Sequence, residues 1–142
     1  MSTRKRLLIV YHSQSGNTAQ LAAAVLRGAQ RAAEVDSTLL RAFDAGTDDL
    51  LTCDGLLLGT PESFGYMSGA LKDFFDRTYY PCEGKLIGLP YAVFVSCGND
   101  GRGAVREIAR IAAGYGWKEV AEALIARKEI TPEPLAAAED LG

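Results

Sequence analysis

Apolar residues along this chain fall into short continuous runs that alternate with stretches of helical spacing. Short apolar runs bounded by glycine, proline or polar residues are typical of strands that are buried on both faces. Strands are expected at residues 7–11, 37–43, 55–59, 91–96 and 119–125. Helices are expected at residues 17–33, 48–51, 68–79, 103–115 and 134–141. Strands that alternate with helices in this way predict a parallel sheet covered by helices on both faces.

The third predicted helix carries the clearest local pattern. Ser68 stands at its start, where a serine side chain can cap the free backbone N–H groups. Lys72 precedes Asp76 by four residues, and Asp73 precedes Arg77 by the same spacing. Opposite charges four residues apart stabilise an exposed helix face, so we expect two ion pairs here.

Composition indicates one globular domain spanning residues 1–142, long enough to bury about two thirds of its unfolded surface. Hydrophobic content of 48% with 23% charged residues is ordinary for such a domain. The net charge of −3 gives no basic footprint for nucleic acid. No apolar run reaches the length of a membrane span, and no secretory signal opens the chain. We therefore expect neither nucleic acid nor a membrane as a partner.

The cysteines and the single histidine argue against a metal site. Cys53, Cys82 and Cys97 are odd in number and widely spaced, and His12 stands alone. This usage favours a reducing, cytoplasmic location over a disulfide scaffold, and it predicts no metal.

A polar loop follows the first predicted strand directly. Its six residues are Ser13, Gln14, Ser15, Gly16, Asn17 and Thr18. Short donors at a helix start, with the positive end of the helix dipole behind them, form a pocket suited to a phosphate. The loop lacks the lysine of P-loop nucleotide hydrolases. Helix capping is the alternative interpretation for any one of these residues, but so many in succession favour the phosphate of a retained cofactor.

Two further specialised loops follow the third and fourth predicted strands. The loop after the third strand contains Pro61, Glu62, Ser63, Phe64, Gly65 and Tyr66. The loop after the fourth contains Cys97, Gly98, Asn99 and Asp100. Ligands of open parallel sheets lie beyond the carboxyl ends of the strands, so the three loops should converge. A phosphate pocket, an aromatic wall and a polar-edge loop together indicate a flavin mononucleotide (FMN) site.

These motifs resemble those of the flavodoxin superfamily. The loop at 13–18 is similar to the superfamily's phosphate loop, and residues 60–75 are similar to the flavin loop and helix of its NAD(P)H-dependent FMN reductase and quinone reductase branch. The resemblance covers most of the chain. It implies an α/β flavodoxin-like three-layer sandwich, with a five-stranded parallel sheet in order 2-1-3-4-5 and helices on both faces.

The resemblance also implies a role for each loop. The residues implied at the FMN phosphate are Ser13, Ser15, Gly16, Asn17 and Thr18, with Gln14 contributing its backbone. Those implied beside the isoalloxazine ring are Pro61, Glu62, Ser63, Phe64 and Gly65, with Tyr66 over it. Those implied at the pyrimidine edge are Cys97, Gly98, Asn99 and Asp100. No catalytic side chain is expected, because the flavin carries the chemistry.

The function implied is NAD(P)H-dependent reduction, by NADH or NADPH, of a small acceptor such as a quinone, a free flavin or an azo compound. The alternative is a flavodoxin-type electron carrier between redox protein partners, without substrate turnover of its own. A third interpretation is a sensor or assembly module in which FMN is regulatory. Electron carriers of this superfamily are strongly acidic, whereas this chain carries −3 and places the basic Arg102 in its third loop, which favours the enzyme. Relatives in the reductase branch form oligomers, so a homodimer stays open.

Overall fold

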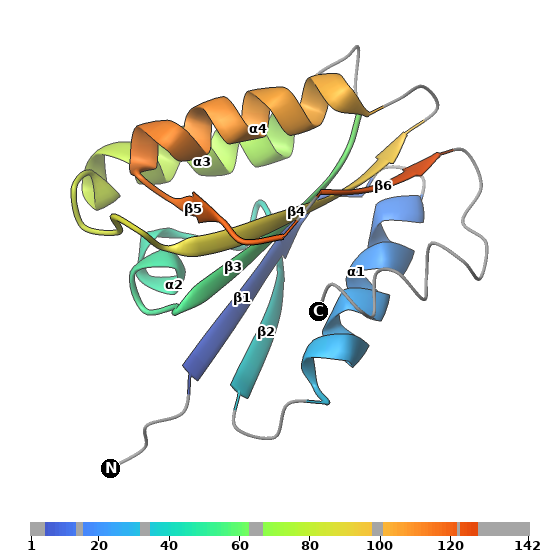
Figure 1. Cartoon of the computed structure of the whole chain (residues 1–142), viewed down its shortest axis with the longest axis horizontal. Helices are drawn as coiled ribbons and strands as arrows, with labels where there is room; N and C mark the ends of the chain where they lie inside the picture. The colour runs from blue at the N-terminus through green and yellow to red at the C-terminus, as the bar shows by residue number, and fades with distance from the viewer. Residues whose placement is uncertain are drawn as a thin grey trace.

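The structure is a computed structural model that describes residues 5–13, 16–31, 35–62, 67–97, 101–121 and 123–127. Strands and helices alternate along this part of the chain (Figure 1). The strands are β1 (Lys5–Tyr11), β2 (Val35–Arg41), β3 (Gly55–Pro61), β4 (Pro90–Cys97), β5 (Lys118–Glu119) and β6 (Leu124–Arg127). The helices are α1 (Asn17–Ala29), α2 (Thr47–Leu51), α3 (Gly69–Cys82) and α4 (Arg102–Tyr115). The helix expected at 134–141 lies outside the described residues.

The strands form one parallel sheet in the order β2-β1-β3-β4-β5, and β6 also pairs with β4. Figure 1 shows α1 on one face of this sheet and α3 and α4 on the other. The predicted strand order 2-1-3-4-5 and the three-layer α/β architecture are therefore confirmed.

The fifth strand differs from the prediction of one continuous strand at 119–125. Glu119 pairs with Tyr91 of β4, and the next pairing joins Leu124 to Phe94. Between these two pairings the fifth strand advances five residues while β4 advances three. This change of register interrupts the ladder and divides the predicted strand into β5 and β6.

Several predicted boundaries were also wrong: β1 and β2 each begin two residues earlier than expected, α3 continues to Cys82, and two elements end early. The helix expected at 17–33 ends at Ala29, because the N–H of Arg31 donates to the carbonyl of Gly28 in a tight turn. The strand expected at 37–43 ends at Arg41, whose carbonyl accepts the N–H groups of Asp44 and Ala45. In both places a local turn replaces the element that the apolar pattern would extend.

Apolar side chains fill both faces of the sheet because the central strands are covered on each side. On the face of α1, the core joins Ile9, Leu57 and Phe94 to helix residues such as Leu21 and Val25. The other core lies beneath α2, α3 and α4 and is larger. Its fully buried members include Val10, Leu58, Phe74, Phe75 and Ile108.

Helix α3 has the cap and the ion pairs that its sequence predicted. The Oγ of Ser68 accepts the N–H of Leu71 at 3.2 Å. The Nζ of Lys72 lies 2.6 Å from Asp76, and the Nε of Arg77 lies 2.7 Å from Asp73.

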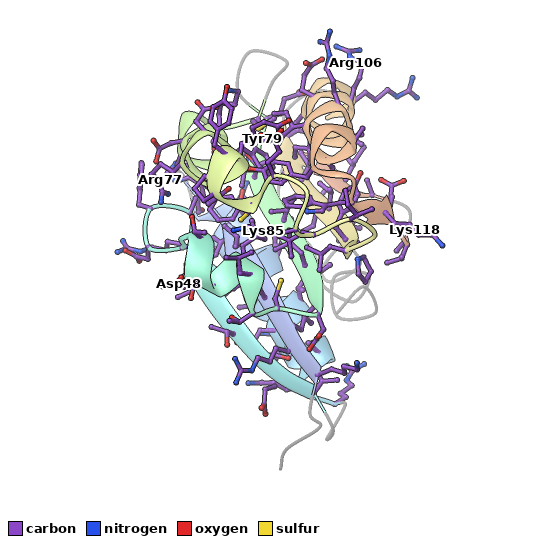
Figure 2. The ribbon with its side chains drawn as sticks, turned by 90° about the vertical axis from the view of Figure 1, so that its left-hand side faces the viewer. Asp48, Arg77, Tyr79, Lys85, Arg106 and Lys118 are labelled. Carbon is purple, nitrogen blue, oxygen red and sulfur yellow. The ribbon has the colours of Figure 1, made fainter. Side chains whose placement is uncertain are left out.

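Arg77 also holds the turn after β2, towards which it extends in Figure 2. Its two terminal nitrogens donate to the carbonyls of Ala42 and Ala45, each at 2.9 Å. The guanidinium thus links α3 to the segment between β2 and α2.

Candidate functional site

The carboxyl ends of β1, β3 and β4 lie side by side at one edge of the sheet. Tyr11 pairs with Gly59, and Pro61 pairs with Ser96. Backbone hydrogen bonds continue this alignment past the strands, since the N–H of His12 donates to Gly59 at 3.1 Å and that of Glu62 donates to Ser96 at 2.9 Å. Figure 1 shows the starts of α1 and α4 at this same edge. The three predicted loops therefore leave the sheet close together, as expected.

The loop after β1 turns into α1 through a glycine. Gly16 has φ +96°, in the left-handed region that favours glycine, and its N–H donates to the Oγ of Ser13 at 3.1 Å. The N-cap residue of α1 is this glycine, which has no side chain that could accept from the first N–H groups of the helix. Among the residues that the structure describes, none lies within 4 Å of the position that a Cβ on Gly16 would take. Gln14 and Ser15 of this loop lie outside the described residues.

Thr18 and Ser96 join the first helix to the end of β4. Thr18 Oγ1 lies 2.6 Å from Ser96 Oγ, and either hydroxyl can be the donor. The two residues are 1% and 5% exposed. The sequence analysis assigned Thr18 to the phosphate but gave Ser96 no binding role. The available signal was the series of alternate residues Ala92, Phe94 and Ser96 on the α1 face of β4, in which the last member is polar.

The loop after β3 is tied together at its base. Thr60 is fully buried, and its Oγ1 accepts the N–H of Ser68 at 2.9 Å while donating to the carbonyl of Pro61 at 2.8 Å. Pro61 and Glu62 are both half-buried. The predicted residues Ser63, Phe64, Gly65 and Tyr66 lie outside the described residues. Thr60 belongs to the motif at 60–75 but was given no role in the site, although a threonine at the end of an apolar strand is a recognisable signal.

The loop after β4 begins at a buried cysteine and ends at a second left-handed glycine. Cys97 is 8% exposed, and Gly101 has φ +71° at the start of α4. A Cβ on Gly101 would lie 2.8 Å from Ile125 and 3.2 Å from the sulfur of Cys97, so the chain passes too closely for a side chain. Gly98, Asn99 and Asp100 lie outside the described residues.

Two contacts with phenylalanine rings lie at this edge of the sheet. A Cβ on Gly59 would lie 2.2 Å from the ring of Phe94, so the bare backbone of β3 makes room for that ring. His12 is half-buried, and its ring meets the edge of Phe43 at a centroid distance of 5.9 Å. Phe43 is 66% exposed and was not predicted as part of the site.

Two cysteines and two tyrosines whose pKa is raised lie at the opposite edge of the sheet, near strand starts and helix ends. Burial raises the pKa of Cys53 to about 11 and that of Tyr115 to about 12. Burial also raises the pKa of Cys82 and of Tyr91. At the carboxyl edge, a hydrogen bond to the Asp44 carboxylate raises the pKa of Arg41, which pairs with Tyr11 at the end of β1.

Every helix in the described part of the chain is too short or too polar to cross a membrane.

Comparison with known proteins identifies the family. A family model described as NADPH-dependent FMN reductase matches residues 41–129, which include the second and third loops. The chain is 34% identical over 112 residues to an NAD(P)H dehydrogenase (quinone) of Acidithiobacillus ferrooxidans, covering 64% of this chain and 56% of that protein. It is 32% identical over 98 residues to a flavodoxin of Aquifex aeolicus, covering 69% and 53%. The chain thus spans little more than half the length of either relative.

The fold is likewise similar to solved flavodoxins. The structure of a flavodoxin from the domain Archaea superposes with a TM-score of 0.81 at 24% identity, covering 96% of this chain and 92% of that one. The flavodoxin-like fold expected from the motifs is confirmed. Since the family model spans more than half of its residues, the chain belongs to the NADPH-dependent FMN reductase family.

Proposed function

We propose that this chain is a single FMN-binding domain, residues 1–142, that uses NADH or NADPH to reduce a small acceptor such as a quinone or a free flavin. The observation that carries the proposal is the convergence of three strand ends beside the start of α1, whose N-cap residue, Gly16, has no side chain to cap the helix. An uncapped helix start is a favourable place for a dianionic phosphate, because its N–H groups and its dipole both favour negative charge.

The chemistry of the first loop fits an FMN phosphate. Ser13, Gly16, Asn17 and Thr18 are uncharged and offer hydroxyl, amide and backbone donors, together with Gln14 and Ser15 of the same loop. Neutral donors suit a phosphate that is bound and retained, rather than one that is transferred. These six residues would hold the phosphate.

The other two loops would hold the ring. Pro61, Glu62, Ser63, Phe64 and Gly65 would run beside the isoalloxazine, with Tyr66 over it. Cys97, Gly98, Asn99 and Asp100 would face its pyrimidine edge. When bound, FMN supplies the transfer of two electrons from a nicotinamide to an acceptor, so the chain needs to bind, orient and shield the ring. The hydrogen bonds of Thr60 to Ser68 and Pro61 support this by holding both ends of the second loop.

A second candidate function is electron transfer between redox proteins, which the identity to the Aquifex aeolicus flavodoxin favours. The moderate net charge of −3 favours the enzyme instead, because charge-steered docking needs a stronger field. We further propose a reducing cytoplasmic location, supported by the buried free thiols of Cys53, Cys82 and Cys97. A homodimer is part of the proposal, on the strength of the oligomeric reductases that the sequence resembles.

Anaerobic titration of the FMN-loaded protein with NADH, and separately with NADPH, tests the proposal. We expect one equivalent of at least one nucleotide to bleach the flavin absorbance band, and a quinone to restore it. Free FMN at the same concentration is the control for bleaching without the protein. Bound FMN that neither nucleotide bleaches within minutes would contradict the enzyme and favour the electron carrier.

A further inference from the structure

Two buried hydroxyls connect elements that lie far apart in the sequence. Thr18 stands in the first turn of α1, and Ser96 is the penultimate residue of β4, 78 positions later. Their oxygens lie 2.6 Å apart, a short distance for a hydroxyl pair. At 1% and 5% exposure, neither side chain has ready access to water.

The two hydroxyl groups carry one more hydrogen than the hydrogen bond between them uses. Each hydroxyl carries one hydrogen, so two are available and the contact between the oxygens takes one. Among the described residues, neither hydroxyl makes a further hydrogen bond. Whichever hydroxyl accepts within the pair therefore has its own hydrogen to donate to a third group. A buried hydroxyl without an acceptor is unfavourable, so the direction of this hydrogen bond matters.

The position of Thr18 determines which direction a bound phosphate favours. Thr18 belongs to the helix start at which we propose the FMN phosphate, whereas Ser96 lies behind it on the sheet. A dianionic phosphate is the strongest acceptor available there, and hydrogen bonds to charged acceptors are about twice as strong as neutral ones. Thr18 then donates to the phosphate, and it accepts from Ser96.

We infer that Ser96 is a positioning residue for the FMN phosphate: its Oγ–H donates to Thr18 Oγ1, so that the hydroxyl hydrogen of Thr18 is directed towards the phosphate. The inference rests on the proposed function and extends it to a residue outside the three loops.

The surroundings of Ser96 support this role. Ser96 continues the alternate series Ala92 and Phe94, whose side chains pack in the apolar core against α1. A small apolar residue would suit the packing of that core, and burying a hydroxyl there is unfavourable unless it makes a hydrogen bond. Its carbonyl also accepts the N–H of Glu62 at 2.9 Å. Ser96 thus contacts the phosphate helix through its side chain and the second loop through its backbone.

The experiment compares FMN with riboflavin, which has the same ring and ribityl chain but no phosphate. Affinities for both are measured by fluorescence titration in the wild type and in Ser96→Ala. We expect the Kd for FMN to rise about fivefold, within the range of the one neutral hydrogen bond that orients Thr18, while that for riboflavin changes less than about twofold. A purely structural role would weaken both flavins equally.

A double-mutant cycle tests whether Ser96 acts through Thr18. In a Thr18→Val background, Ser96→Ala should cause no further loss of FMN affinity, because the hydroxyl that it orients is already gone. Additive losses would overturn the inference. Ser96→Thr retains the hydroxyl and should show the same preference for FMN over riboflavin as the wild type. This variant still tests the inference if Ser96→Ala folds poorly.

A second buried hydroxyl pair provides the matched control. Thr78 Oγ1 lies 2.8 Å from the phenolic oxygen of Tyr115, near the ends of α3 and α4 and away from the three loops. Thr78→Val should lower stability and leave the ratio of the two flavin affinities unchanged.

The outcomes separate the inference from the proposed function. A wild type that binds neither flavin overturns the proposed function, and the inference with it. A wild type that prefers FMN, with the same preference retained in Ser96→Ala, overturns the inference alone.

Discussion

Thr60→Val removes the hydroxyl that holds the base of the second loop while nearly preserving the shape of the side chain. In the wild type this hydroxyl accepts the N–H of Ser68 and donates to the carbonyl of Pro61. Thr60 is fully buried and Ser68 is 1% exposed, so water cannot easily replace the lost acceptor. The substitution therefore leaves a buried N–H group without its partner.

The magnitude follows from that unpaired group. Leaving a buried donor unsatisfied costs about 1–3 kcal/mol, and we expect the free energy of unfolding to fall by this amount. Pro61 is half-buried, so its carbonyl should contribute less than the N–H of Ser68. Urea denaturation followed by circular dichroism measures the change, with an unaltered m-value showing that the folded state stays compact.

Thr52→Val is the matched control for this prediction. Its Oγ1 donates to the carbonyl of Asp48 at 2.9 Å in an exposed position, where water replaces the lost bond. Its stability should change by less than about 0.5 kcal/mol. Equal stability losses in the two variants would refute the claim that Thr60 holds the loop. Flavin affinity gives a second reading: because the loop is proposed to contact the ring, Thr60→Val should weaken FMN and riboflavin to the same extent.

Three other predictions can be checked by denaturation. Gly59→Ala should lower the free energy of unfolding by about 1–3 kcal/mol, because its Cβ would lie 2.2 Å from the buried ring of Phe94. Recovery of stability when Phe94→Leu is added would support this cause, and an unchanged denaturation midpoint in Gly59→Ala would contradict it. The pKa of Cys53 is raised by burial from 9.0 to about 11, so the folded state keeps its proton after the unfolded state has lost it. Stability should therefore be intact below pH 9 and fall by about 1.4 kcal/mol per pH unit up to pH 11, less steeply in a Cys53→Ala variant; equal slopes would refute it. Arg77→Met should lower the free energy of unfolding by about 1–2 kcal/mol, because two hydrogen bonds to carbonyls are lost. The exposed Arg110→Met should lower it by less than about 0.5 kcal/mol. Equal losses in the two variants would argue against a structural role for the Arg77 guanidinium.

Much of the fold could be predicted from the sequence because the determinants are local. The apolar runs at 55–59 and 91–96 became β3 and β4 with two residues added to each, since short runs between turn residues leave little choice. Ser68 and the ion pairs of α3 were likewise local features. The change of register between β5 and β6 could not be foreseen, because it arises from pairing with a strand that is distant in the sequence.

The site divides in the same way. Parallel topology brings the ends of β1, β3 and β4 together, so the loops beginning at Ser13, Pro61 and Cys97 follow from the order of elements. The contacts beneath the loops do not follow from it. Thr18 meets Ser96 across 78 residues, a juxtaposition that depends on packing between α1 and β4 and leaves no short-range signature.

The central claim is that the three converging loops bind FMN, and a titration of the purified protein with FMN tests it most directly. Flavin fluorescence should be quenched to an end point at one FMN per chain, and riboflavin should bind more weakly because it lacks the phosphate. Saturable binding of FMN that is no tighter than that of riboflavin would contradict the phosphate site at the start of α1. No binding of either flavin would contradict the account as a whole.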